Sequence, residues 1–243
     1  MKWFRWVWLA GTLALLGEAF YQAMYVAPVE ATMGNIYRIF YYHVPAAWVT
    51  FLFFLINLVA SIVYLAMRHR DPLRAMGADA LALASAEVGV LFCTAVLMMG
   101  MLWARPVWGI WWTWDARLTS TFAMWLIYCS YLLLRRLAAG PQMQTLAAAL
   151  AIFGYADVPI VYFSTRWWRT QHPSPVIGGG PDSGLDPTMW PPLLWNLAAW
   201  LAWGLMLIAI RYAIERRRQL REQDESLRAL EATLEPTPWK ENE

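Results

Sequence analysis

The sequence contains few charged residues. Of its 243 residues, only 15% are Asp, Glu, Lys or Arg, whereas 60% are hydrophobic. Soluble globular domains carry about 25% charged residues, so this composition excludes an ordinary soluble protein. The net charge is only +2, and we expect no nucleic-acid partner.

Cysteine is also scarce. Cys93 and Cys129 are the two cysteines of the sequence, each lies within an apolar run, and no CxxC or CxxCH motif is present. The sequence therefore indicates neither a redox dithiol nor a covalent haem attachment site, and both thiols are expected to be packing residues. The sequence also lacks a Walker motif and a hydrolytic triad. We therefore expect a protein that is not an enzyme and does not itself hydrolyse ATP.

Long apolar runs take the place of the missing charges. A bilayer core about 30 Å thick needs roughly 20 apolar residues per helix. Six runs meet this length or approach it, at residues 6–25, 47–67, 81–103, 119–137, 146–163 and 193–212. They predict an all-α polytopic membrane protein with six transmembrane helices, for which membrane lipid is an expected partner. The first run could also be a signal peptide, but its length and the lack of a clear cleavage site favour a retained helix.

The distribution of Lys and Arg predicts the orientation of these spans. The segments that follow the first, third and fifth runs, at residues 26–46, 104–118 and 164–192, hold five of the 19 basic residues. These five are Arg38, Arg105, Arg117, Arg166 and Arg169. Because Lys and Arg gather on the cytoplasmic side, both termini are expected to be cytoplasmic. The three arginine-bearing segments would then face the periplasm, outside a bacterial inner membrane.

Two units follow from this pattern: a membrane domain over residues 1–214 and a charged cytoplasmic tail over residues 215–243. Four leucines of the tail, Leu220, Leu227, Leu230 and Leu234, are spaced to share one face of a helix. The pattern favours a solvated helix that extends the last span. A docking helix for a cytoplasmic partner is the alternative. Within the third periplasmic segment, the glycine-rich stretch at residues 178–181 predicts an irregular, mobile flap.

The periplasmic segment after the third run is unusually rich in tryptophan. Trp108, Trp111, Trp112 and Trp114 lie within ten residues and are followed by Asp115 and Arg117. Such rings could form an aromatic platform for a flat, apolar and partly charged ligand, for which haem is the obvious candidate. If the stretch is helical, the spacing would place Trp108, Trp111, Trp112 and Asp115 on one face.

An aromatic belt at the membrane interface is the simpler interpretation of many other tryptophans. It explains Trp3, Trp6, Trp8, Trp48, Trp195, Trp200 and Trp203. It explains the clustering between Trp108 and Trp114 less well, so we interpret that loop as functional.

Two of the three histidines fall on the same predicted side as this loop. His43 lies before the second run and His172 in the third periplasmic segment, whereas His69 lies in a basic inner turn. Two such histidines could supply both axial nitrogens to a haem iron. Each alone would more often be a hydrogen-bonding residue. Any of the five periplasmic arginines could bind haem propionates, because a guanidinium matches a carboxylate bidentately.

Three acidic residues, Glu18, Glu87 and Asp157, interrupt apolar runs. Charged groups at that depth are costly and are functional candidates by default, although pairing between helices would also explain them. Asp157 precedes Val158-Pro159, where the sequence predicts a kink.

Residues 109–119 resemble the tryptophan-rich WWD signature of the haem-handling proteins of cytochrome c maturation, most closely the CcmC haem-delivery branch. Tyr42-His43-Val44-Pro45 resembles the first histidine motif of that family. The segment from Asp157 through Ser164 and Trp167-Trp168 to His172 resembles the second. Two features depart from the pattern: Asp157 stands where we expect an amide, and residues 178–184 look like a local insertion.

The resemblance implies that His43 and His172 ligate a non-covalent haem b. It implies a haem platform made of Trp111, Trp112, Trp114 and Asp115, to which we add Trp108 and Arg117 as binding residues. It further implies delivery of haem to the periplasmic chaperone CcmE, in a complex with the ABC transporter subunits CcmA and CcmB and the small membrane protein CcmD. The main alternative is a haem transporter or exporter subunit. A membrane oxidoreductase, a haem–cytochrome synthase and a structural subunit are further alternatives.

Overall fold

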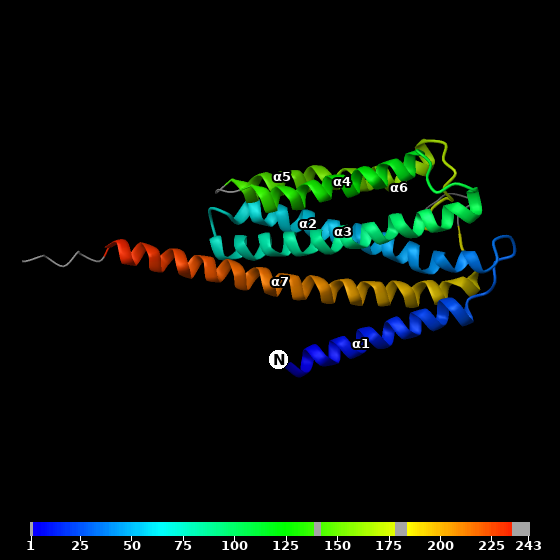
Figure 1. The fold of residues 1–243 in the computed structure, drawn as a ribbon, viewed down its shortest axis with the longest axis horizontal. Coiled ribbons are helices and arrows are strands. Elements are labelled where there is room, and N and C mark those ends of the chain that lie inside the picture. The colour runs from blue at the N-terminus through cyan, green and yellow to red at the C-terminus, as the bar shows by residue number, and fades with distance from the viewer. Residues whose placement is uncertain (1, 139–141, 178–183, 235–243) are drawn as a thin grey trace, which may run out of the picture.

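The computed structural model describes residues 2–138, 142–177 and 184–234. These residues form an all-helical fold, in which no β-strand occurs, as the sequence predicts. Six helical rods lie side by side along one long axis (Figure 1). The rods are α1 (Lys2–Tyr21), α2 (Phe40–Met67), α3 (Pro72–Trp108), α4 (Ala116–Leu137), the pair α5 (Met143–Tyr155) and α6 (Asp157–Trp167), and α7 (Trp190–Leu234).

Four of these segments are long and apolar enough to cross a membrane. They are Asn35–Met67, Pro72–Trp108, Met143–Trp167 and Pro187–Thr233. The two other rods, α1 and α4, carry charged residues near their ends, including Arg5 and Glu18 in α1 and Arg135 in α4. The chain is thus a multi-pass membrane protein by length and composition of its helices, and six spans remain a prediction.

The fifth predicted run is broken into two helices, with the break at Ala156. Pro159 cannot donate a backbone hydrogen bond to Tyr155, and its ring would clash with the carbonyl of that residue. The kink predicted beside Asp157 is therefore confirmed.

Two predicted boundaries were wrong because the helices extend beyond the apolar runs. Helix α2 begins at Phe40, so His43 lies in its first turns and not in a loop. Helix α3 continues to Trp108, which shortens the tryptophan-rich loop to residues 109–115.

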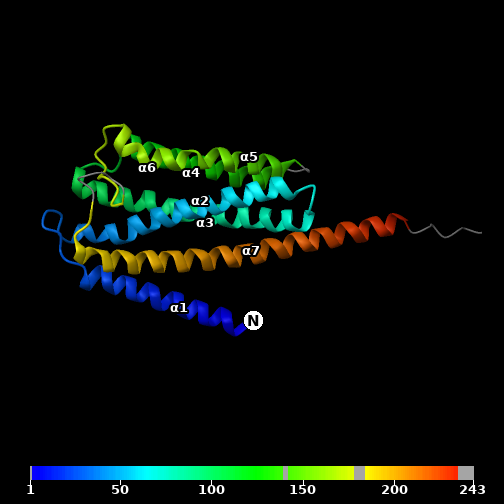
Figure 2. The same ribbon diagram turned by 180° about the vertical axis from the view of Figure 1, so that it is seen from behind.

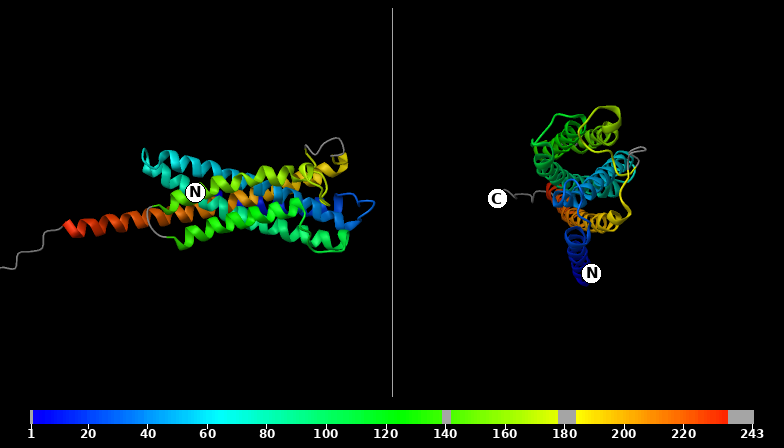
Figure 3. Two further views of the ribbon diagram at one scale, coloured as in Figure 1. Left: turned by 90° about the horizontal axis from the view of Figure 1, so that it is seen from above. Right: turned by 90° about the vertical axis from the view of Figure 1, so that its right-hand side faces the viewer.

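Helices α2 and α3 form an antiparallel pair at the centre of the bundle (Figure 3). Small residues on α3, among them Ala82, Ala86 and Gly89, are buried in this contact. At Gly89, an added Cβ would lie 2.5 Å from the Phe54 ring, so the close approach of α2 requires glycine. The Phe54 ring in turn stacks on Tyr128 of α4, with ring centroids 3.6 Å apart.

The segments predicted to lie on one side of the membrane gather at one end of the bundle. The connections before α2, between α3 and α4, and after α6 lie together there, whereas the link between α2 and α3 lies at the opposite end (Figure 2). Helix α1 leaves the bundle toward its N-terminus and is tied to α7 near the first end, where Asn196 Nδ2 donates to the Ala19 carbonyl at 3.0 Å.

Two other predictions concern the chain beyond the membrane runs. Residues 215–234 continue α7, and its first residues still pack on the bundle, because Glu215 is buried and Gln219 Nε2 donates to Asp79 of α3. Leu220, Leu227 and Leu230 are exposed, which agrees with a solvated helix that extends the last run (Figure 1). The rest of the tail, 235–243, and the glycine-rich stretch at 178–181 lie outside the described residues.

Candidate functional site

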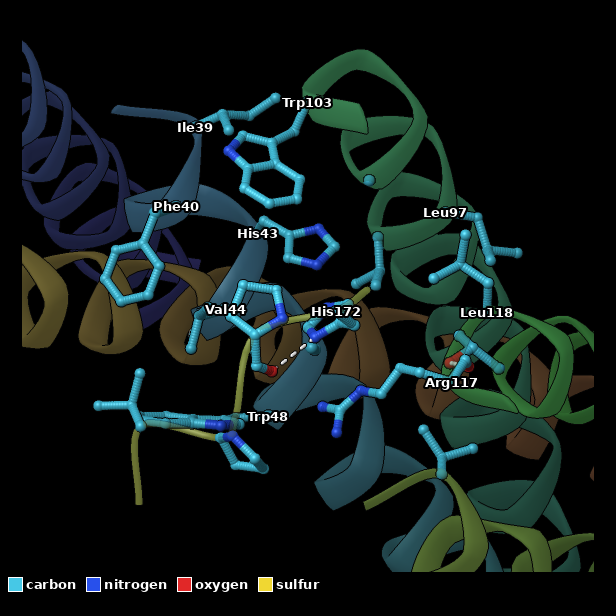
Figure 4. Close-up of a pocket in the computed structure, with 18 of the residues that line it drawn as sticks. Ile39, Phe40, His43, Val44, Trp48, Leu97, Trp103, Arg117, Leu118 and His172 are labelled. Carbon is cyan, nitrogen blue, oxygen red and sulfur yellow. Dashed lines mark hydrogen bonds between the residues drawn. The ribbon is translucent and has the colours of Figure 1, made fainter. Parts of the chain in front are cut away.

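A cavity of about 400 Å³ lies among α2, α3, α4, α6 and the loop after α6. Its volume falls within the range of small-molecule sites, roughly 300–1,000 Å³. On α2 its lining runs from Phe40 to Phe51, a rise of about 16 Å at 1.5 Å per residue. Most of the lining is apolar, and its basic side chains are His43, Arg117 and His172 (Figure 4).

Both candidate histidines line this cavity. His43 comes from α2 and His172 from the loop after α6, so residues 129 positions apart meet in one space (Figure 4). The two residues lie on segments that are far apart in the sequence, so it is the tertiary fold that brings them together.

Local hydrogen bonds fix the orientation of His172 in the way that is usual for a metal-binding histidine, with one ring nitrogen bonded to a carbonyl and the other free. Its ring Nδ1 lies 2.8 Å from the Pro173 carbonyl and must donate to it, which leaves Nε2 as the free lone pair. The backbone N–H of His172 donates to Thr170 Oγ1 at 3.1 Å and fixes the turn. Burial and the nearby positive charge of Arg117 lower the pKa of His172 to about 3, against the smaller effect of the Pro173 hydrogen bond. The ring is therefore neutral at physiological pH and able to bind a metal.

Two buried polar atoms at the cavity have no partner among the described residues. They are Nδ1 of His43 and the indole Nε1 of Trp112. Leaving a buried donor or acceptor unsatisfied costs about 1–3 kcal/mol, so a ligand that engages these atoms would remove the penalty. A haem fits this set, because its iron can bind an imidazole nitrogen and a propionate oxygen can accept from an indole N–H.

A bare metal ion fits the same residues poorly. Within the described ranges, no group of three or more His, Cys, Asp or Glu side chains is placed to hold a metal ion. Two imidazoles alone leave most coordination positions of a metal unfilled, whereas a porphyrin would itself supply four nitrogens.

The tryptophan-rich loop divides into buried and exposed parts. Trp108 and Trp112 line the cavity. Trp111 and Trp114 are 55% and 74% exposed and do not line it. The Trp112 ring packs edge-on against Trp114 and Phe122, with centroids 5.6 and 5.9 Å apart, so the two parts remain in contact.

The loop is not helical, so the condition for a shared tryptophan face is not met. Helix α3 ends at Gly109, whose φ of +79° places it in the left-handed region that favours glycine. The chain stays irregular until Ala116. Asp115 does not line the cavity: its carboxylate accepts the Leu118 N–H at 2.9 Å and caps α4. Asp115 thus orders the loop by capping α4.

Arg117 is the one arginine of the five candidates whose side chain lines the cavity within the described ranges. Its Nη1 donates to the Tyr162 carbonyl at 3.3 Å, and no carboxylate lies within ion-pair distance of it in the described part of the chain. The other four are engaged elsewhere or exposed. Arg38 and Arg105 donate to backbone carbonyls, Arg166 lies over the Phe163 ring, and Arg169 is exposed. Arg117 is therefore the cation placed to meet an anionic ligand group.

Sequence reasoning missed several lining residues of α2 and α3. Trp48, which the membrane belt explains equally well from the sequence, lies in the cavity wall with Phe40 and Trp103 (Figure 4). The missing signal was the early start of α2: with His43 on a helix, positions 40, 44, 47, 48 and 51 fall on or near its face.

The acidic residues of the apolar runs differ in their surroundings. Glu87 pairs with Arg211 of α7, with Oε1 2.9 Å from Nη2, so pairing between helices explains it. Glu18 accepts from Gln22 Nε2 at 2.8 Å within its own segment. Asp157 Oδ2 is buried without a hydrogen-bond partner among the described residues.

Comparison with known proteins agrees with the site. Residues 1–225 match the family described as heme exporter protein C. The chain is 36% identical to heme exporter protein C of Bradyrhizobium diazoefficiens over 229 residues, which cover 93% of this chain and 83% of that protein. It is 30% identical to heme exporter protein C of Escherichia coli K12, over 88% of this chain and 82% of that protein. A putative cytochrome c biosynthesis ccmC-like mitochondrial protein of Arabidopsis thaliana is 34% identical, over 84% of this chain and 74% of that protein.

Proposed function

Because the chain belongs to the heme exporter protein C family, we propose that it binds haem at the periplasmic face of the inner membrane and delivers it to the chaperone CcmE. In this proposal the protein has six spans, both termini are cytoplasmic, and CcmA, CcmB and CcmD are its partners in cytochrome c maturation. The observation that carries the proposal is the meeting of His43 and His172 in one largely apolar cavity.

In this proposal, each functional residue around the cavity contacts a different part of the haem. His43 and His172 ligate the iron of a non-covalent haem b, and the neutral state of His172 makes its nitrogen available. Trp108 and Trp112 contact the macrocycle, and Arg117 binds a propionate. Haem is the cargo in this scheme, so the protein holds and orients it and performs no chemistry of its own.

The exposed part of the tryptophan-rich loop is where we expect the haem acceptor to dock. Trp111 and Trp114 lie on the surface beside the cavity wall. Their rings supply an apolar contact for the acceptor where an edge of the macrocycle would emerge. Asp115 supports both parts of the loop by capping α4.

A transporter that moves haem across the bilayer is the second candidate, favoured by the name heme exporter protein C that two of the relatives carry. Such a path would have to continue below the cavity. There, the Phe54–Tyr128 stack and the pairing of Asp79 with Arg135 occupy the space between α2, α3 and α4. These contacts support delivery from one face over passage through this chain.

The test is an absorption spectrum of the detergent-purified protein, expressed with and without CcmE. We expect a low-spin Soret band in the wild type that is lost or shifted in both His43→Ala and His172→Ala. His69→Ala is the matched control, because His69 lies at the opposite end of α2 and should leave the band unchanged. A folded wild-type protein without haem in either condition would contradict the proposal.

A further inference from the structure

A second cavity, of about 470 Å³, lies at the opposite end of the bundle from His43 and His172. It is formed where α2 ends and α5 begins, and these two ends lie beside each other (Figure 1). Its lining consists of Tyr64, Arg68, His69, Gln142, Thr145 and Leu146. Haem binding at the other end uses none of these residues.

The rim of this cavity is suited to an anion. Arg68 Nη1 donates to Thr145 Oγ1 at 2.7 Å, which holds the guanidinium across the space between the two helices. No carboxylate pairs with Arg68 among the residues that the structure describes. His69 adds a ring N–H beside it.

The start of α5 adds to this positive potential. The first four backbone N–H groups of a helix have no partner within the helix, and they carry the positive end of its dipole. Gln142, at the N-cap of α5, makes no side-chain hydrogen bond to these groups. An anion in the cavity would therefore meet the Arg68 guanidinium from α2 and the backbone N–H groups at the start of α5.

The wall of the cavity is apolar on the side of the membrane core. Tyr64 and Leu146 lie four residues inside Arg68 and Gln142, which is about 6 Å deeper along each helix. Leu146 is 54% exposed. The site thus presents donors at the level where each membrane segment ends and hydrocarbon contacts one turn below.

We propose that this cavity binds the phosphate group of an anionic phospholipid. The guanidinium fork matches phosphate oxygens, and basic pockets between membrane helices on the cytoplasmic side bind such headgroups. Inorganic phosphate shares the headgroup chemistry, but it has no acyl chain to contact Tyr64 and Leu146. The phospholipid is therefore the occupant that uses the whole site.

The test uses the full-length protein, delipidated in a neutral detergent. Native mass spectrometry and the tryptophan-fluorescence melting temperature are recorded with phosphatidylglycerol, phosphatidylcholine or inorganic phosphate. Phosphatidylglycerol should bind and raise the melting temperature more than the other two. An interfacial arginine changes lipid affinity about fivefold, so Arg68→Gln should bind phosphatidylglycerol about fivefold more weakly.

Arg70→Gln is the matched control, because Arg70 is exposed like Arg68 but lies outside the cavity lining. Thr145→Val keeps the charge of Arg68 but removes its anchor, and it should weaken binding by less than Arg68→Gln. It also provides a measurement if Arg68→Gln does not fold. Equal losses in Arg70→Gln and Arg68→Gln, equal binding of phosphatidylcholine, or equal stabilisation by inorganic phosphate would overturn the proposal.

Discussion

The two halves of the bundle treat buried charge in opposite ways. In the half away from the haem cavity, the buried Asp79 carboxylate is paired: it accepts two hydrogen bonds from Arg135 and a third from Gln219 Nε2 at 3.1 Å. Glu87 similarly pairs with Arg211. At the cavity, Arg117 donates to a backbone carbonyl and has no carboxylate partner among the described residues.

We interpret the paired charges as structural and the unpaired cation at the cavity as functional. A charge taken out of water without a partner is costly, so an unpaired cation beside a cavity favours a site that another molecule completes. The paired groups connect α3 to α4 and α7 and hold the helices together. His43, Trp112 and Arg117 instead line a cavity, where a haem with an iron and two propionates would satisfy them.

The largest effect should come from breaking the buried pair. Arg135→Ala leaves Asp79 as an uncompensated carboxylate, because the side chains of this pair are 5% and 6% exposed. The free energy of unfolding should fall by about 3–5 kcal/mol. Denaturant unfolding in detergent, followed by tryptophan fluorescence, measures the change.

The matched control replaces both partners, as Asp79→Leu with Arg135→Met. Because no charge is then left buried, this double variant should regain most of the lost stability. If it is as unstable as Arg135→Ala, the pair is not what holds α3 to α4.

Removing the unpaired charge should have the opposite outcome. Arg117→Gln should weaken haem binding by about 10- to 100-fold, since a hydrogen bond to a charged group contributes about 1.5–3 kcal/mol. Its unfolding free energy should stay equal or rise, because an unpaired cation is removed. Haem titration gives the affinity, and Arg169→Gln, an exposed arginine of the same end, is the control. A stability loss like that of Arg135→Ala would break the comparison between the two halves.

The sequence predicts the helical fold, the kink at Asp157 and the histidine pair from short-range patterns. The spacing of Pro159 from Tyr155 determines the kink directly. Apolar runs do not report where a helix continues into polar residues, and so the early start of α2 and the role of Trp48 in the cavity wall were missed. Arg117 is the one of the five candidate arginines that lines the cavity in the described part of the chain. Which arginine does so depends on tertiary packing, so no local sequence pattern predicts it.

The buried and the exposed parts of the tryptophan-rich loop should also differ in their effect on haem binding. Trp112→Ala removes a ring that lines the cavity, and Trp114→Ala removes one that is 74% exposed. We expect Trp112→Ala to weaken haem binding by at least the 0.5–1.5 kcal/mol that is roughly the worth of an aromatic contact. Trp114→Ala should leave haem affinity nearly unchanged and slow transfer to CcmE. Haem titration and a transfer assay separate the two, and equal losses of haem affinity would contradict this division of the loop.

The smallest effect is expected at Asp115, and it distinguishes a cap from a ligand contact. The carboxylate accepts the Leu118 N–H at 2.9 Å, and Thr113 Oγ1 donates to its other oxygen at 3.2 Å, so the residue acts within its own loop. Asp115→Ala removes the cap and should cost about 1 kcal/mol of stability, with haem affinity reduced only as far as the loop loosens. Asp115→Asn keeps a capping oxygen and should match the wild type in both unfolding and haem titration. If Asp115→Asn instead lost haem affinity with unchanged stability, the negative charge itself would be needed at the haem, and the separation of capping from binding in this loop would fail.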